Sequence, residues 1–141
     1  IKIEVDTNPP LSFATEQRLM VQPYSFMVQC MTLPCLFAGK MHALVYRQWK
    51  NRVKGRDWYD FEWYVRWNHP LNWAHLHERI VEFSGKECTN AEFLELLHHR
   101  LATTDINQVK ADVLPFVHHP QELDIWSNDY FLQLAQRIRW E

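Results

Sequence analysis

The N-terminal residues of the chain alternate between apolar and polar side chains. In residues 1–5, IKIEV, the apolar residues occupy the odd positions and the charged residues the even ones. This two-residue period is typical of a strand with one buried face. Residues 23–31 alternate similarly, and Pro9-Pro10 between the two segments cannot continue a strand ladder. The pattern predicts two strands, with a short strand or an irregular connection over residues 11–22.

From about residue 35 onward, the apolar residues follow the 3.6-residue period of helices. Leu33-Pro34 suits a helix start, because proline is tolerated in a first turn. The spacing predicts helices over residues 35–48, 57–67, 72–83, 90–101, 105–118 and 121–139. Thr89 or Asn90, and Asp105, are suitable N-cap residues for two of them.

Together these elements predict an α+β fold, in which two or three N-terminal strands precede a bundle of five or six helices. No repeat, low-complexity segment or clear linker divides the chain. We therefore expect a strand-containing part over residues 1–34 and a helical part over residues 35–141. The first part begins inside an apparent strand and without a start methionine, which indicates a piece of a longer protein.

Composition narrows the classes of function. The net charge of −2 gives no overall basic field for nucleic acid or a membrane surface. Three glycines are too few to favour a glycine-rich phosphate loop. The three cysteines form no CxxC motif, which favours reduced thiols and a cytoplasmic protein. No apolar run approaches the roughly eighteen residues needed to span a bilayer, so we expect no membrane partner.

The segment LFAGKMHALVYRQWKNRVKGRDWYD, residues 36–60, carries most of the candidate chemistry. Lys40 and Arg47 are nearly two helical turns apart, so their side chains point the same way. Asp57 and Asp60 are three residues apart and share a face of the next helix. Cations and carboxylates on adjoining helix faces suit a site that handles a polyphosphate and its metal ions.

A structural interpretation of the same residues remains open. Asp57 follows Gly55-Arg56 at a position suited to an N-cap, and Asp60 three residues later resembles part of a capping box. Lys40 and Arg47 could then simply form ion pairs with these carboxylates. The basic loop over residues 50–56 could likewise be a solvated loop, or it could contact NTP phosphates or an RNA backbone.

Two further groups of side chains have alternative interpretations. The paired histidines lack the i, i+4 spacing of a helical zinc site, and we interpret them as surface or capping residues. An aromatic cluster over residues 58–67 favours core packing, with base stacking as the alternative. At the N-terminus, Glu4 and Asp6 share one face of the predicted strand. A carboxylate there suits a metal ion or a cationic ligand.

Three segments of the sequence resemble those of a known family. KIEVDTNPP, LFAGKMHAL and KGRDWYD together are similar to the AbiEii/AbiGii-type nucleotidyltransferase toxins of abortive-infection and toxin–antitoxin systems. The most specific element is a Lys-x-x-Ala-x-x-x-Arg helix followed by Arg-Asp-x-x-Asp, and the resemblance is good over residues 1–67. It implies a polymerase-beta-like core followed by helices, and Mg²⁺-dependent transfer of a nucleotide from an NTP to an acceptor that is often RNA.

The resemblance also implies roles for individual residues. Glu4, with Asp6 beside it, matches the acidic position next to the metal pair, and Lys40 matches a lysine that contacts nucleotide phosphates. Asp57 and Asp60 match a catalytic or site-ordering acidic pair. Arg47 and Arg56 match basic positions around them that are implied to contact phosphates or to pair with those acids. Lys54, in the basic loop, is a further candidate for a phosphate contact.

One departure from the family is large. Its Gly-Ser element and its Asp-x-Asp metal pair should precede residue 1, and nothing in the chain supplies them. The resemblance therefore implies the distal part of a nucleotidyltransferase, inactive by itself. The alternative is a non-catalytic helical module that binds an antitoxin or nucleic acid.

Overall fold

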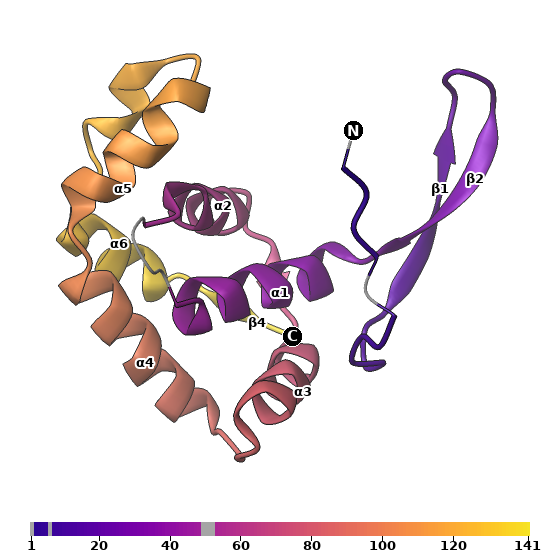
Figure 1. Cartoon of the computed structure of the whole chain (residues 1–141), viewed down its shortest axis with the longest axis horizontal. Helices are drawn as coiled ribbons and strands as arrows, with labels where there is room; N and C mark the ends of the chain where they lie inside the picture. Colours follow the sequence, from indigo (N-terminus) through magenta and orange to yellow (C-terminus); the bar gives the residue numbers. More distant parts are fainter. Residues whose placement is uncertain (1, 6, 49–52) are drawn as a thin grey trace.

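The computed structural model describes residues 2–5, 7–48 and 53–141. Within them a two-stranded hairpin is followed by six α-helices, two short 3-10 helices and a second small sheet (Figure 1). The elements in chain order are β1 (Thr15–Met20), β2 (Phe26–Met31), α1 (Leu33–Tyr46), α2 (Gly55–Arg66), β3 (Pro70–Leu71), α3 (Trp73–Ser84), α4 (Asn90–Thr103), α5 (Ile106–Val113), η1 (Leu114–Phe116), η2 (Pro120–Leu123), α6 (Asn128–Ala135) and β4 (Arg139–Trp140). The predicted α+β class, with strands before helices, is confirmed.

The predicted strand over residues 1–5 is wrong. Residues 2–5 have no regular structure, and the supposedly buried side chains of Ile3 and Val5 are 82% and 77% exposed. Lys2 pairs with Glu4 instead of facing a ligand. Alternation shows which side of a strand would be buried, but the strand itself needs a hydrogen-bonded neighbour. Among the described residues, no neighbouring strand pairs with this segment.

The first strand instead lies within residues 11–22, for which the sequence predicted either a short strand or an irregular connection. β1 pairs antiparallel with β2, from Thr15 opposite Met31 to Met20 opposite Phe26. The hairpin projects from the helical body, on the right of Figure 1. Apolar residues near its tip are each between 39% and 70% exposed, namely Leu19, Met20, Val21, Tyr24, Phe26 and Met27.

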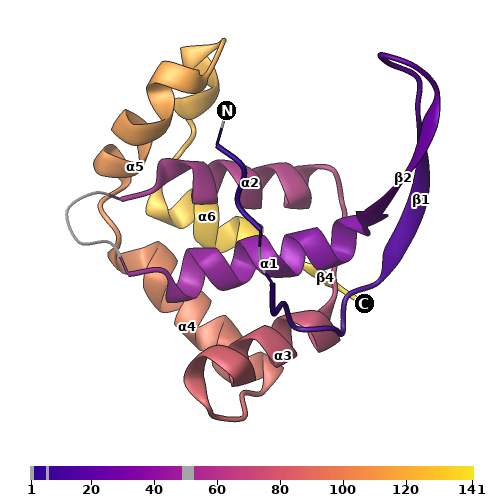
Figure 2. The same ribbon diagram turned by 45° about the vertical axis from the view of Figure 1, so that its right-hand side comes forward.

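The helical body forms around α1. Three of its apolar side chains, Phe37, Met41 and Leu44, are fully buried. Figure 2 shows α1 and α2 running side by side, and the Phe37 and Tyr64 rings stack between them with centroids 4.6 Å apart. Burial of apolar surface of this kind is the main force holding the helices together. No helix in the described parts of the chain combines the length and the apolar character needed to cross a bilayer.

The helix ends test several sequence predictions. Thr89 forms a complete capping box at the start of α4, and Asp105 caps α5, as predicted. Asp57 is not an N-cap, since α2 begins two residues earlier and Lys54 occupies the cap position. The single helix predicted over residues 121–139 is also wrong. It is divided into η2 and α6, because the Ser127 side chain accepts a hydrogen bond from the Tyr130 amide and starts a new helix.

Two histidines on neighbouring helices, the half-buried His42 of α1 and the buried His75 of α3, give the fold a pH dependence. His42 and His75 both interact unfavourably with Arg79 when protonated, and burial is the larger cause in each case. Burial lowers the pKa of His42 to about 4 and also lowers that of His75. Both rings are therefore neutral in the folded protein near pH 7.

We expect the free energy of unfolding to fall as the pH falls from about 6.5 towards 4. Over this range the unfolded chain binds protons that the folded His42 ring does not, and the loss should be on the order of 1–2 kcal/mol because the ring is partly open to solvent. Urea denaturation across this pH range measures it. In His42→Gln the loss should become smaller, whereas in the exposed control His98→Gln it should not. Equal pH dependence in both variants would contradict this account.

Candidate functional site

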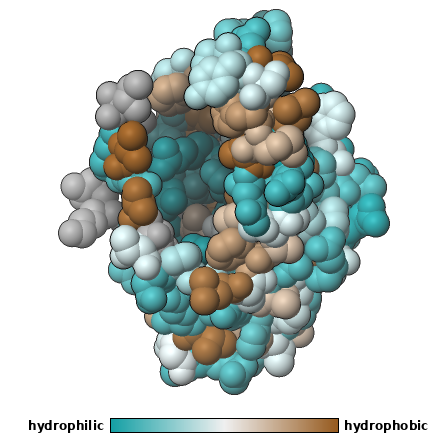
Figure 3. Space-filling model, turned by 90° about the vertical axis from the view of Figure 1, so that its right-hand side faces the viewer, coloured by the Kyte–Doolittle hydropathy of each residue, from teal (hydrophilic) through white to brown (hydrophobic). Residues whose placement is uncertain are grey.

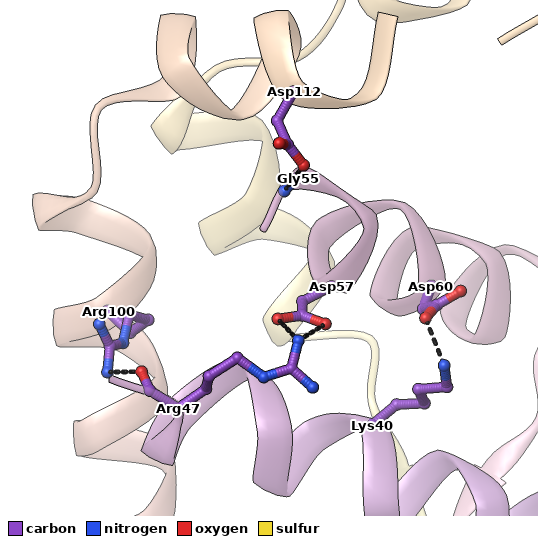
Figure 4. Close-up of polar contacts among 7 residues, drawn as sticks. All are labelled: Lys40, Arg47, Gly55, Asp57, Asp60, Arg100 and Asp112. Carbon is purple, nitrogen blue, oxygen red and sulfur yellow. Dashed lines mark hydrogen bonds and ion pairs between the residues drawn. The ribbon is translucent and has the colours of Figure 1, made fainter. Parts of the chain in front are cut away.

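Two ion pairs connect α1 with α2 (Figure 4). Lys40 Nζ lies 2.8 Å from Asp60 Oδ2. Arg47 Nη1 lies 3.0 Å from Asp57 Oδ1 and 2.9 Å from Oδ2. The seven-residue spacing on α1 and the three-residue spacing on α2 place both pairs along one seam between the helices, as the sequence pattern indicates. The structure thus brings together four of the predicted site residues.

The two pairs differ in their access to solvent. The Asp57 side chain is only 3% exposed and that of Arg47 is 35% exposed. Burial raises the pKa of the Asp57 carboxyl, and the neighbouring Arg47 and Arg56 guanidiniums offset part of this rise. A carboxylate buried in this way needs its partner, because an unpaired buried charge is costly. The Arg47–Asp57 pair therefore primarily joins α1 to α2.

The Lys40–Asp60 pair is open by comparison. The Lys40 side chain is 46% exposed and that of Asp60 is 29% exposed. An ion pair at such a position contributes little to stability, typically about 0–1 kcal/mol. Its charges remain reachable by a ligand, and Lys40 can exchange its carboxylate partner for a phosphate at small cost. Of the two pairs, this one suits ligand binding.

Two contacts from distant parts of the sequence hold the seam in place. Asp112 on α5 accepts a 2.8 Å hydrogen bond from the Gly55 amide at the start of α2, where no side chain of α2 itself provides a cap. Arg100 on α4 donates to the Val45 carbonyl at the end of α1, over 2.6 Å. Figure 4 shows the contact between Asp112 and Gly55, and a further hydrogen bond that Arg100 donates to the Arg47 carbonyl. Neither residue was predicted from the sequence, because no local pattern indicates a contact over more than fifty positions.

Gly55 allows α2 to approach α5. A Cβ atom on Gly55 would lie 2.3 Å from the Val109 carbonyl oxygen and 3.2 Å from Asp112 Cβ. We expect Gly55→Ala to lower the free energy of unfolding by about 1–3 kcal/mol, because backbone atoms must move. Chemical denaturation measures the change. The matched control is Gly39→Ala in α1, where a Cβ would meet nothing within 4 Å. This control should raise stability by about 0.5–1 kcal/mol, and equal effects would contradict the account.

Lys54 and Arg56 do not join the two ion pairs. They line a cavity of about 470 Å³ between the start of α2 and the α5–η1 segment, together with Tyr59, Asp112 and Phe116. Arg56 and Tyr59 are three residues apart on α2, and Arg56 is four residues from Asp60, so the cavity and the ion-paired seam are neighbours on this helix. Four basic residues were predicted to form one site. In the structure Lys40 and Arg47 instead pair with the acids of α2, whereas Lys54 and Arg56 line the cavity.

The predicted metal ligands form no site in the described residues. Glu4 is exposed and pairs with Lys2, and Asp6 lies outside the described residues. Among the residues that the structure describes, no three His, Cys, Asp or Glu side chains gather as they would around a metal ion. A lone exposed carboxylate does not fit the several oxygen ligands that Mg²⁺ takes.

The side of the molecule from which the hairpin projects is hollowed. Figure 3 looks onto this side and shows a depression whose visible walls are mainly hydrophilic, bordered by scattered apolar residues. In Figures 1 and 2 the N-terminal segment runs on the same side of the α1–α2 pair. Polar walls distinguish this depression from an apolar docking groove.

Comparison with known proteins identifies the family. A family model described as "Nucleotidyl transferase AbiEii toxin, Type IV TA system" matches residues 1–134, well beyond the residues 1–67 that carry the resemblance in sequence motifs. No curated protein and no solved structure gives a significant match. Because the match extends over nearly the whole chain, the chain belongs to the AbiEii family of nucleotidyl transferase toxins.

Proposed function

We propose that the chain is the distal part of a Mg²⁺-dependent nucleotidyltransferase of the abortive-infection type, acting in the bacterial cytoplasm. It would transfer a nucleotide from an NTP to an acceptor hydroxyl. In this reaction the acceptor oxygen forms a bond to the α-phosphorus, the bond to the β-phosphate oxygen breaks, and pyrophosphate leaves. The observation that carries the proposal is the exposed Lys40–Asp60 pair on a helix seam, in a chain of this family.

Lys40 would bind the NTP phosphates. Negative charge builds on the phosphate oxygens as pyrophosphate leaves, and an ammonium group held at that place stabilises it. Asp60, 2.8 Å from Lys40 Nζ, would hold the ammonium group in position before the NTP binds. Asp60 could also accept the proton of the acceptor hydroxyl once a phosphate has replaced it beside Lys40.

The second pair would position the site and not touch the reacting atoms. Asp57 is almost completely buried and holds Arg47 through two contacts to one nitrogen. We propose that this pair fixes α2 relative to α1, and so keeps Asp60 in reach of Lys40. The exposed part of the Arg47 side chain remains available for a phosphate contact.

The proposed reaction also needs a metal ion and an acceptor, and a toxin of this family implies an antitoxin. We propose that carboxylates preceding residue 1 bind Mg²⁺, with Glu4 and Asp6 beside them. We also propose that RNA is an acceptor and that an antitoxin protein controls the activity. These parts rest on the family and on the residues that match its motifs.

One observation favours a second candidate function, a non-catalytic module that binds an antitoxin or nucleic acid. Both acids of the Arg-Asp-x-x-Asp motif are already engaged in ion pairs, as ordinary structural residues would be. This candidate predicts that the complete protein transfers nothing from an NTP.

The experiment that tests the proposed function compares two radioactive labels. The protein encoded by the complete gene is incubated with Mg²⁺, bacterial RNA and ATP, CTP, GTP or UTP labelled on either the α- or the γ-phosphate. We expect label on the RNA from the α-phosphate alone, with the γ-label released as pyrophosphate. Transfer of the γ-label would indicate phosphoryl transfer, and the absence of any transfer would favour the non-catalytic module.

A further inference from the structure

The cavity beside the start of α2 combines positive charge with open aromatic surface. Its volume is about 470 Å³, within the range of pockets that bind small molecules. Lys54 and Arg56 contribute the charge, and no described residue forms an ion pair with either of them. Tyr59 and Phe116 contribute the aromatic surface, with 38% and 78% of each residue exposed.

Phe116 is the member of this combination that lies farthest from the packed core, whereas the Tyr59 ring also contacts the buried Trp126. Phe116 follows Pro115 in η1 and lies outside the buried core, whereas the neighbouring Val113 is 4% exposed and packs into it. Exposed aromatic rings beside cations are the features with which proteins bind single-stranded nucleic acids, through base stacking and phosphate contacts. Asp112 brings one negative charge to the cavity, but its Oδ2 already accepts the Gly55 amide hydrogen bond.

The cavity adjoins the proposed NTP site but shares no residue with it. The residues that line the cavity include neither Lys40 nor Asp60, although Arg56 is about one helical turn from Asp60 on α2. Two cations and a carboxylate match the single charge of one internucleotide phosphate better than the several charges of a triphosphate. The cavity therefore suits a nucleotide within a strand.

We infer that this cavity binds one unpaired nucleotide of a single-stranded nucleic acid, with the base against Tyr59 and Phe116 and the phosphate between Lys54 and Arg56. The identification of that strand as the acceptor rests on the proposed function. A strand seated here would cross the edge of α2 towards the Lys40–Asp60 pair. Binding at this cavity would then select acceptors with an unpaired segment.

Fluorescence anisotropy of the 141-residue chain tests this inference directly. The probes are a fluorescein-labelled single-stranded RNA dodecamer, its DNA counterpart and an RNA duplex of the same sequence. Phe116→Ala should weaken binding of both single strands about tenfold and leave the dependence on salt unchanged. Arg56→Gln should lower the slope of log K against log salt by about 0.7. The matched controls are Leu114→Ala in η1 and Arg66→Gln at the other end of α2.

The outcomes separate this inference from the proposed function. Unchanged RNA binding in Phe116→Ala and Arg56→Gln would overturn the inference, even if the complete protein transfers nucleotides. Displacement of the RNA by ATP at this cavity would also overturn it, since the ligand would then be the NTP. Weaker RNA binding in both variants, with the controls unchanged, would support it even if the complete protein shows no transfer.

Discussion

Lys40→Ala should lower the rate of nucleotide transfer by the complete protein by about 10²–10³-fold. The ammonium group lies on an open helix seam with one partner, Asp60, at 2.8 Å, and it is the cation best placed to meet the charge that develops on a leaving pyrophosphate. The measurement is the initial rate of α-label incorporation at saturating NTP. The fold should remain intact, since loss of this exposed pair costs no more than about 1 kcal/mol.

Two companion variants make the result specific. Lys86→Ala removes an equally charged but exposed residue outside the seam, and its rate should equal that of the wild type. Lys40→Arg keeps the charge in a different geometry and should recover only part of the rate. A Lys40→Ala protein with the rate of the wild type would exclude Lys40 from the reaction.

Arg47→Ala should have the largest effect on stability, lowering the free energy of unfolding by about 3 kcal/mol. The variant leaves the Asp57 carboxylate without its partner at a position where it is 2% exposed. It also removes the connection that joins the end of α1 to the first turn of α2. Urea denaturation at pH 7 measures the change, with Lys40→Ala as the matched control in which an exposed pair is lost.

The pH dependence of this variant provides a second test. Without Arg47, burial should raise the pKa of Asp57 further above its value in the unfolded chain, so the folded state binds the additional proton. The loss of unfolding free energy relative to the wild type should therefore be largest at neutral pH, and it should shrink as the pH falls through the raised pKa of Asp57. Asp57→Asn in the Arg47→Ala background should recover part of the loss at pH 7. If Arg47→Ala lost as little unfolding free energy as Lys40→Ala, the structural role of the Arg47–Asp57 pair would be contradicted.

Local signals in the sequence predicted the helical part of the fold well. Pro34 in a first turn, Thr89 and Asp105 each carry their information within one helical turn, and the helices begin where these residues indicate. Strands behave differently, since their formation depends on a partner elsewhere in the chain. Residues 2–5 alternate perfectly yet form no strand, whereas Thr15–Met20 does form one because Phe26–Met31 pairs with it.

In the candidate site, too, only the features that depend on spacing within one helix were predictable from the sequence. Helical spacing correctly indicated that Lys40 and Arg47 would face Asp57 and Asp60 across one seam. It could not show that one pair is buried and the other open, since burial depends on α4, α5 and α6 packing around the seam. Asp112 lines the cavity, and its contact with Gly55 depends on a similar long-range approach. The position of Phe116 in that cavity likewise had no signal in the sequence.

The proposed role of Lys40 is to hold the nucleotide. Calorimetric titration of the complete protein with a non-hydrolysable ATP analogue tests this role most directly. Wild type and Lys86→Ala should bind the analogue with the same dissociation constant, and Lys40→Ala should bind it at least tenfold more weakly, since a charge-assisted contact to phosphate is worth about 1.5–3 kcal/mol. Equal binding by all three proteins would contradict the account.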